Sequence, residues 1–218
     1  MPEEANAMIP AELAGGLTKF DDAAFKDITK SGDYIPRLQL MTSNSKQCKS
    51  GDFPTNHYAF IRDQNFQDLG ETLDVLLVTW RAKALEMGEQ VISVFDMASE
   101  EFKRIQEKSA EQDSGCMYGP EFLVYLPGLK EFATFFCGSK SARREAANIK
   151  ALLTKPATLK SKFIETKRYS WFTVCATPCS TPFDPPDLDA LRKIVEKFNN
   201  PPVSQIEAAP EEETDRER

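Results

Sequence analysis

The chain has 218 residues, a net charge of −7 and a sequence pI of about 5.0, which argue against a generically basic nucleic-acid binder. Hydrophobic residues make up 41% of the chain and supply a sizeable core, and no apolar run approaches the roughly 20 residues that a membrane span requires. Five cysteines, mostly at wide spacing, and the lack of a secretory signal at the N-terminus indicate reduced thiols and a cytoplasmic protein.

Residues 1–33 are rich in Ala, Gly and Asp and predict a flexible N-terminal arm. From residue 34 onward, apolar segments bounded by Gly, Asp, Asn or Pro predict a series of strands, of which 72–81 is long enough to be central. The short connection 127–130 predicts a hairpin between two of them. The expected strands are 34–41, 57–62, 72–81, 91–95, 120–126, 132–137, 157–166 and 169–175.

About three helices are expected among these strands. Ser99 is a suitable N-cap for a helix with Phe102 and Ile105 on its apolar face, and segments 141–153 and 187–198 have helical spacing. Because the strands come in pairs without regular βαβ alternation, the sequence predicts an α+β domain over residues 34–199, with a mainly antiparallel sheet or barrel. Residues 200–218 are rich in Asn, Pro, Ala and Glu and predict a disordered acidic tail.

Charge is unevenly distributed along the chain. Residues 140–170 hold nine basic and two acidic side chains, a local charge of +7, whereas residues 201–218 hold six acidic and two basic ones, a charge of −4. A basic surface can neutralise phosphates and release counterions. The acidic tail could occupy that surface when nucleic acid is absent, and it could engage a partner protein when nucleic acid displaces it.

Aromatic residues are interleaved with this basic segment, as in Lys162-Phe163 and in residues 167–172. Cations beside aromatic rings suit single-stranded nucleic acid, whose bases stack on any ring regardless of sequence. The alternative is a strand with one face in the core and its Lys and Arg side chains in water. The candidate nucleic-acid-binding residues are Lys140, Arg143, Arg144, Lys160, Lys162, Lys167, Arg168, Tyr169 and Trp171, with Trp80, Arg81 and Lys83 as a second patch.

No motif predicts an enzyme active site, a cofactor site or a metal site. His57 is the one histidine and lies outside any catalytic motif, and Cys175 and Cys179 form a C-x3-C pair with no second close pair to complete a zinc site. Residues 138–144 lack the complete phosphate-loop motif, although backbone N–H groups at a helix start there could hold a single phosphate. The sequence therefore favours a binding protein over an enzyme.

Four stretches carry a resemblance to a known family: DSGCMYGPEFLVYLP (113–127), FATFFCGSKSARREA (132–146), ATLKSKFIETKRYSW (157–171) and CSTPFDPPD (179–187). They resemble small proteins of tailed bacteriophages over roughly residues 35–200. The combination of a basic, aromatic body and an acidic tail looks like the single-stranded DNA-binding proteins of phage replication. That resemblance implies an elaborated OB-fold barrel and an acidic C-terminal tail that recruits polymerase and helicase. Here the tail ends in Arg216-Glu217-Arg218, whereas the tails of those proteins end in acidic and aromatic residues.

The expected function is sequence-nonspecific binding of single-stranded DNA in phage replication or recombination, in the host cytoplasm, without a cofactor and without contact to a membrane. Replication or recombination proteins are further expected partners through the tail, and homo-oligomerisation stays open. The alternatives are a phage structural or host-interaction protein that uses the basic helix 141–153 as a protein-binding face, and, third, a metal-dependent nuclease.

Overall fold

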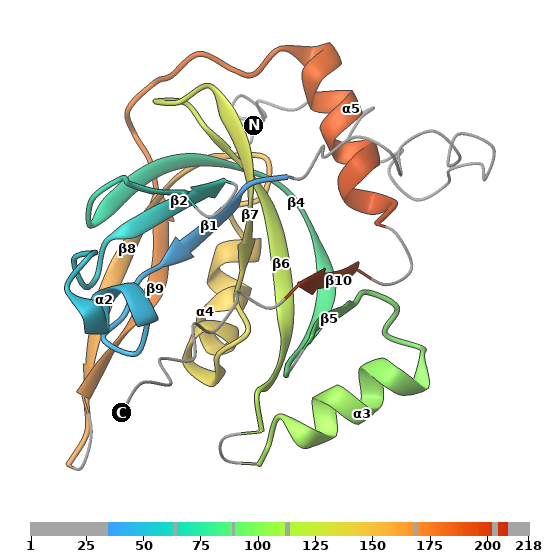
Figure 1. Cartoon of the computed structure of the whole chain (residues 1–218). Coiled ribbons are helices and arrows are strands. Elements are labelled where there is room, and N and C mark those ends of the chain that lie inside the picture. Colours follow the sequence, from blue (N-terminus) through green and yellow to red (C-terminus); the bar gives the residue numbers. More distant parts are fainter. Residues whose placement is uncertain are drawn as a thin grey trace.

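The computed structural model describes residues 35–62, 65–88, 90–111, 114–167, 170–201 and 205–208, which form an α+β fold (Figure 1). The expected N-terminal arm, 1–33, lies outside these residues. The strands are β1 (Arg37–Leu40), β2 (Tyr58–Arg62), β3 (Asn65–Asp68), β4 (Thr72–Met87), β5 (Gln90–Val94), β6 (Cys116–Leu126), β7 (Glu131–Phe136), β8 (Pro156–Glu165), β9 (Ser170–Pro178) and β10 (Gln205–Ala208). The helices are α2 (Lys46–Ser50), α3 (Glu100–Lys108), α4 (Lys140–Lys150) and α5 (Leu188–Asn199).

Strand β4 organises the sheet. It is 16 residues long and pairs with β6 on one side over residues 76–86. On its other side, residues 72–76 pair with β8 and residues 84–87 pair with β5, so two different strands share one edge of β4. The register of the β4–β6 pair shifts between Leu77 and Thr79, and such an irregularity bends a strand. The long strand β4 therefore belongs to two parts of the sheet, one that continues into β8 and one that continues into β5.

All but one of the strand pairs are antiparallel, as the sequence predicts, and the exception is the parallel pair of β1 and β7. The sheet follows the order β10-β5-β4-β6-β7-β1-β2-β3, and the β8–β9 hairpin branches from β4. Because β7 pairs with β1 and β9 pairs with β8 alone among the described strands, strand pairing does not close the sheet into the expected barrel.

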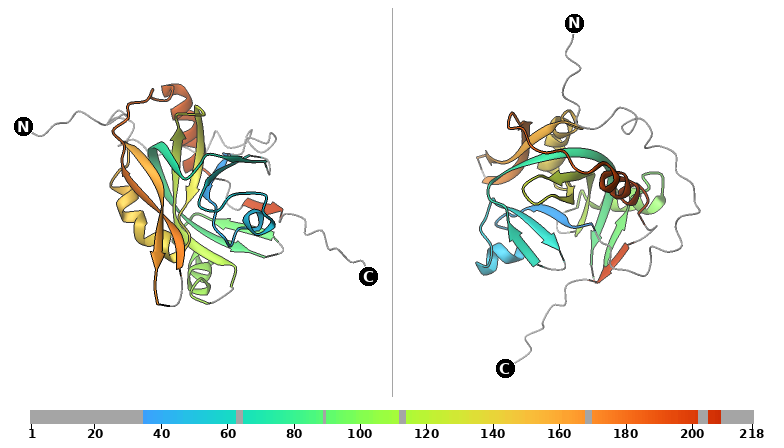
Figure 2. Two further views of the ribbon diagram at one scale, coloured as in Figure 1. Left: turned by 90° about the vertical axis from the view of Figure 1, so that its left-hand side faces the viewer. Right: turned by 90° about the horizontal axis from the view of Figure 1, so that it is seen from above.

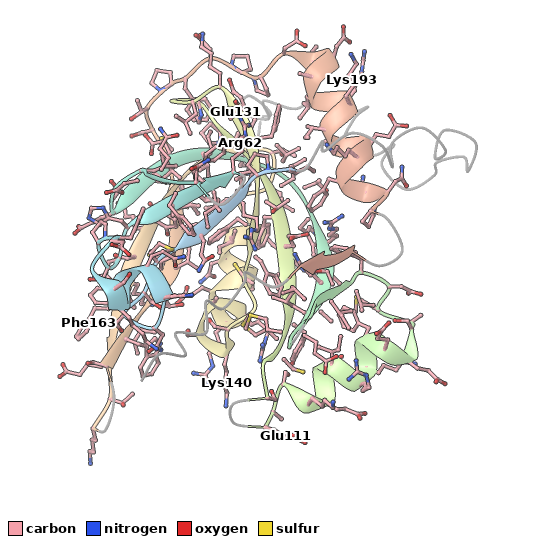
Figure 3. The ribbon with its side chains drawn as sticks, viewed as in Figure 1. Arg62, Glu111, Glu131, Lys140, Phe163 and Lys193 are labelled. Carbon is pink, nitrogen blue, oxygen red and sulfur yellow. The ribbon has the colours of Figure 1, made fainter. Side chains whose placement is uncertain are left out.

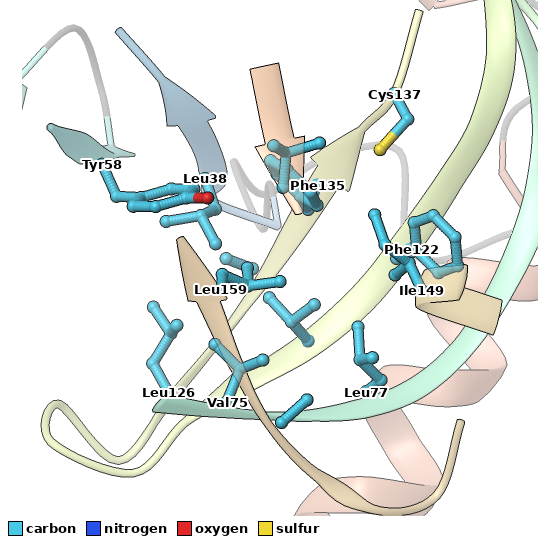
Figure 4. Close-up of a cluster of buried hydrophobic side chains, with 14 of the residues drawn as sticks. Leu38, Tyr58, Val75, Leu77, Phe122, Leu126, Phe135, Cys137, Ile149 and Leu159 are labelled. Carbon is cyan, nitrogen blue, oxygen red and sulfur yellow. The ribbon is translucent and has the colours of Figure 1, made fainter. Parts of the chain in front are cut away.

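The largest hydrophobic core lies inside the curled sheet and includes side chains from β1, β2, β4, β6, β7, β8, β9 and α4 (Figure 4). Val75, Leu77, Phe122 and Leu159 are fully buried in it, and α4 contributes Ile149. The hydroxyl of Tyr58, at the start of β2, donates a hydrogen bond of 3.0 Å to the carbonyl oxygen of Lys160. Strand β2 thus contacts β8 through this hydrogen bond, although the two are not paired in the described sheet.

Helix α5 covers part of the opposite face of β4 and β6. Its buried residues Leu191, Val195 and Phe198 pack with Leu123 and other side chains of this face. The side chain of Asp187 caps the helix by accepting hydrogen bonds from two backbone N–H groups of the first turn. The views in Figure 2 show α5 on the outside of the sheet, beside the long strands. Both faces of β6 are therefore covered along most of its second half.

The structure confirms most of the expected elements and adds three. The expected helices correspond to α3, α4 and α5, with Ser99 and Ser139 as N-caps of the first two, and the 120–126/132–137 hairpin is formed by β6 and β7. Elements α2, β3 and β10 were not expected. Strand β10 lies within the segment 200–218 that the sequence predicts to be disordered, and its four residues pair with β5.

Candidate nucleic-acid interface

Strands β8 and β9 form an arm that extends beyond the rest of the sheet. Pairing between β4 and β8 ends at Lys160, and from Ser161 onward β8 pairs with β9 alone among the described residues. The hairpin continues to Glu165 and Ser170 and projects from the body in both side views (Figures 1 and 2). We use the term arm for residues 160–175. Six of the predicted site residues belong to this segment of the sequence, namely Lys160, Lys162, Lys167, Arg168, Tyr169 and Trp171.

Three lysines of the arm are exposed. Lys160 and Lys167 make no ion pair within the described part of the chain. Lys162 lies 3.0 Å from Glu145 of α4, which also accepts a hydrogen bond from Asn148. These hydrogen bonds, chiefly the one from Lys162, hold the pKa of Glu145 below its ordinary value. The arm therefore presents positive charge of which one α4 carboxylate neutralises a part.

Helix α4 presents two further predicted cations to solvent and turns the third inward. Lys140 and Arg144 are exposed, and Figure 3 shows Lys140 at the start of the helix. The Arg143 guanidinium donates to the carbonyl oxygens of Tyr118, at 3.0 Å, and Gly138, and its central carbon lies 4.1 Å from the centre of the Tyr118 ring. Arg143 therefore ties α4 to β6 through one terminal nitrogen of its guanidinium and through the Tyr118 ring.

Trp80 is separate from the neighbouring Arg81 and Lys83, because consecutive residues of a strand point to opposite faces. Its ring is 37% exposed. The Nζ atom of Lys150, at the end of α4, lies 3.0 Å from the ring centre. Desolvation lowers the pKa of Lys150. The ammonium group of Lys150 thus already lies against the indole ring of Trp80.

Arg81 and Lys83 project from the outer face of β4 and share one buried carboxylate. Glu121 on β6 is 2% exposed, and its oxygens lie 2.6 Å from the Arg81 guanidinium and 2.8 Å from the Lys83 ammonium. Burial alone would raise the pKa of Glu121, but the charges of Lys83 and Arg81 outweigh it and hold that pKa below its ordinary value. The cations themselves are only 16% and 12% exposed. The structure thus places these two residues in an internal ion cluster.

Aromatic rings enclose this cluster. The Arg81 guanidinium carbon lies 3.8 Å from the centre of the Phe95 ring and 4.2 Å from that of Phe198, and Arg81 also donates to the Phe198 carbonyl. The Lys83 ammonium lies 5.7 Å from the Phe95 ring centre and 5.4 Å from that of Phe136. We call Arg81, Lys83, Glu121, Phe95, Phe136 and Phe198 the face cluster. Its cations stack on rings of the protein itself.

The most exposed aromatic residue in the described part of the arm is Phe163, which is not one of the candidate stacking residues. Arg168 and Tyr169 lie outside the described residues, and Trp171 is half-buried on the strand face that also carries Lys162. The opposite face carries Phe163, which is 53% exposed and lies opposite Phe172, with ring centres 5.1 Å apart and planes inclined by 53°. The alternation of β8, with Leu159 inside, places Phe163 on the face that is continuous with the core. The alternation by itself identifies the strand face on which Phe163 lies. The exposure of the ring follows only from the structure, because the β4–β8 pairing ends at Lys160.

Within the described part of the chain, no group of three or more His, Cys, Asp or Glu side chains is arranged to hold a metal ion. No helix among these residues is long and apolar enough to cross a membrane. No protein-family description, curated protein or solved structure is significantly similar to this chain. The case for a function therefore depends on the arrangement of its own residues.

Proposed function

We propose that this chain is a sequence-nonspecific single-stranded DNA-binding protein on an elaborated, partly open OB-like barrel, of the kind used in phage replication or recombination in the host cytoplasm. The observation that carries the proposal is the position of the arm. It lies where the fourth and fifth strands of an OB-like series would be connected, and among the described residues it combines exposed lysines with the exposed ring of Phe163.

The strand connectivity supports the OB-like interpretation. An OB fold is a five-stranded, partly open Greek-key barrel. Here β4 pairs with β6 and β8, β6 pairs with β7, α4 lies between β7 and β8, and β8 pairs with β9. Strands β1, β2, β3, β5 and β10 are then additions to the five-stranded unit. OB folds bind oligonucleotides with the loop between strands four and five, among other elements.

The charge of the arm supports nucleic acid as the ligand. Lys160, Lys162 and Lys167 are exposed, with Glu165 as the one carboxylate among the described residues of the arm. Each lysine that contacts a phosphate releases condensed counterions, so binding driven by them weakens as salt rises. Contacts of this kind read the backbone and not the base sequence, which agrees with a nonspecific binder.

The test is a fluorescence titration with a poly-dT oligonucleotide at about 50 mM and 200 mM salt, with Trp80 and Trp171 as reporters. We expect quenching at low salt and much weaker binding at high salt. The double variant Lys160→Glu/Lys167→Glu should bind weakly. Its matched control, Lys103→Glu/Lys193→Glu, reverses two exposed lysines on α3 and α5 and should bind like the parent chain.

Equal binding by both double variants, or no binding by the parent chain at low salt, would refute the proposal. A structural or host-interaction protein would then be favoured, since Lys140 and Arg144 form an exposed cationic face on α4 that a protein partner could contact. Incubation of labelled DNA with Mg²⁺ or Mn²⁺ separates both functions from a nuclease, which would cleave the DNA.

A further inference from the structure

We propose that single-stranded DNA follows the arm, with the Phe163–Phe172 ring pair as its stacking platform, and does not use the outer face of β4, β6 and β7. The inference rests on the proposed function and names the surface that serves it. In OB folds generally, the face of the second and third strands is part of the binding site. In this chain those strands are β6 and β7, so the two surfaces have to be compared.

The first half of the argument is that α5 covers one end of the sheet face. Leu123 is fully buried and Tyr125 is 5% exposed on the outer side of β6, where they pack with α5. The helix side chains at this contact, Leu191, Val195 and Phe198, are themselves buried. Moving α5 away would expose both sets of side chains to water, at about 25 cal/mol for each Å² of apolar surface. This end of the face is therefore part of a core.

The face cluster occupies the next part of the same face. Its two cations share Glu121, and Arg81 also donates to the carbonyl of Phe198 on α5. The rings of Phe95 and Phe198 have the Arg81 guanidinium against them at 3.8 and 4.2 Å. A base could stack there only by displacing this cation from its partners. The cluster thus joins α5 to the sheet. Its cations and rings already contact one another, so they offer few groups that could bind a nucleotide.

The arm has the opposite properties. Phe163 is 53% exposed, and no cation lies over its ring or over that of Phe172 within the described residues. The tilted pair offers an aromatic surface next to the edge of β8 that, beyond Lys160, pairs with no other described strand. Lysines 160 and 162 extend from the other side of the same strand, so a nucleotide strand along this edge can meet rings and cations together. The positive charge makes a polyanion the favoured occupant.

The experiment measures oligo-dT affinity for Phe163→Ala and Phe163→Leu at fixed salt, followed by the salt dependence of each. Loss of one stacked base should weaken binding by about 5- to 150-fold in the Ala variant. The slope of log affinity against log salt should stay unchanged, because the phosphate contacts remain. Phe163→Leu keeps an apolar side chain but has no ring, so it should also bind weakly. Phe163 is exposed, so both variants should fold, and circular dichroism checks this.

Two controls address the other surfaces. Leu188→Ala removes an exposed apolar side chain from α5, and Gln39→Glu adds a negative charge to the outer side of β1, beside β7. Both should bind DNA like the parent chain. A strong loss of affinity in Gln39→Glu would place the DNA on the sheet face and overturn the inference.

Other results also overturn it. If Phe163→Ala and Phe163→Leu bind like the parent chain while Lys160→Glu/Lys167→Glu binds weakly, the platform is wrong and the proposed function stands. If only the Leu variant binds normally, the contact is apolar and not stacking. If Phe163→Ala abolishes self-association in sedimentation experiments without altering DNA binding, the ring pair is a contact between copies of the chain. No binding by the parent chain refutes both proposals.

Discussion

The face cluster and the arm contain the same kinds of side chain with opposite consequences. In the face cluster, Arg81 and Lys83 lie among three phenylalanine rings and share the buried carboxylate of Glu121. On the arm, Lys160 and Lys167 are exposed without an ion pair among the described residues, and the rings of Phe163 and Phe172 contact each other. The presence of Lys, Arg and Phe side chains therefore does not by itself distinguish a buried ion cluster from an exposed surface.

The difference comes from the position of each group relative to the body of the fold. At Glu121, β6 is covered by α5 on one face and by the main core on the other, so a charge there needs a partner of opposite sign. Beyond Lys160, β8 pairs as a strand with β9 alone among the described residues, and side chains of the same types are exposed there.

The largest effect is expected for Glu121→Gln. The substitution keeps the shape of the side chain but removes the carboxylate charge that Arg81 and Lys83 share in this largely buried cluster, which should lower the free energy of unfolding by about 3–5 kcal/mol. Urea denaturation followed by circular dichroism measures it. Glu107→Gln, an exposed residue of α3, is the matched control and should stay within about 0.5 kcal/mol of the parent chain. A neutral result at Glu121 would mean that the cluster is more hydrated than its burial indicates.

The same substitution placed in each region should separate stability from binding. Lys83→Ala should destabilise the chain by about 1–3 kcal/mol, because Glu121 loses one buried partner, and should leave the salt dependence of DNA binding unchanged. Lys160→Ala should leave stability within about 0.5 kcal/mol and reduce the slope of log affinity against log salt by about 0.7, the value for one phosphate of a single strand. Similar behaviour of the two variants would remove the distinction between the regions.

Acid should weaken the ion pair between Glu86 of β4 and Arg104 of α3, which is more exposed than the ion pairs of Glu121. Hydrogen bonds from Arg104 lower the pKa of Glu86 to about 2 from an ordinary 4.5, so its contribution to stability is present above pH 4.5 and is lost as the pH falls toward 2. Arg104 is 41% exposed, so solvent screening limits the contribution to about 1 kcal/mol. Unfolding of the parent chain and of Glu86→Gln, compared between these pH values, measures it. A difference that grows toward low pH would contradict this sign.

The smallest effect is expected for Glu145→Gln. Loss of the carboxylate frees Lys162 of the arm from its ion pair, so affinity for oligo-dT at low salt should rise about twofold, and high salt should abolish the gain. Asn148 can still donate to the new amide oxygen, which keeps α4 intact. Weaker binding by this variant would instead mean that Glu145 positions Lys162 for its phosphate.

Local patterns predicted most elements of this fold. The Ser99 N-cap, the apolar spacing of α3 and α5, and the short turn between β6 and β7 are determined by neighbouring residues, and the structure confirms them. The missed elements lack such patterns. Strand β3 has a single large apolar residue, Phe66, and β10 becomes a strand by pairing with β5. The extension of β4 to Met87 likewise depends on its partners β5 and β6.

The sequence by itself determined most of the element types, the mainly antiparallel pairing and the concentration of positive charge between residues 140 and 170, since these depend on local spacing and composition. Only the tertiary structure decided which charges reach solvent. Glu121 is 38 residues from Lys83 along the chain, and their pairing requires β4 and β6 to be adjacent. Likewise, Phe163 is exposed because the β4–β8 ladder ends at Lys160, and the length of a ladder depends on both of its strands.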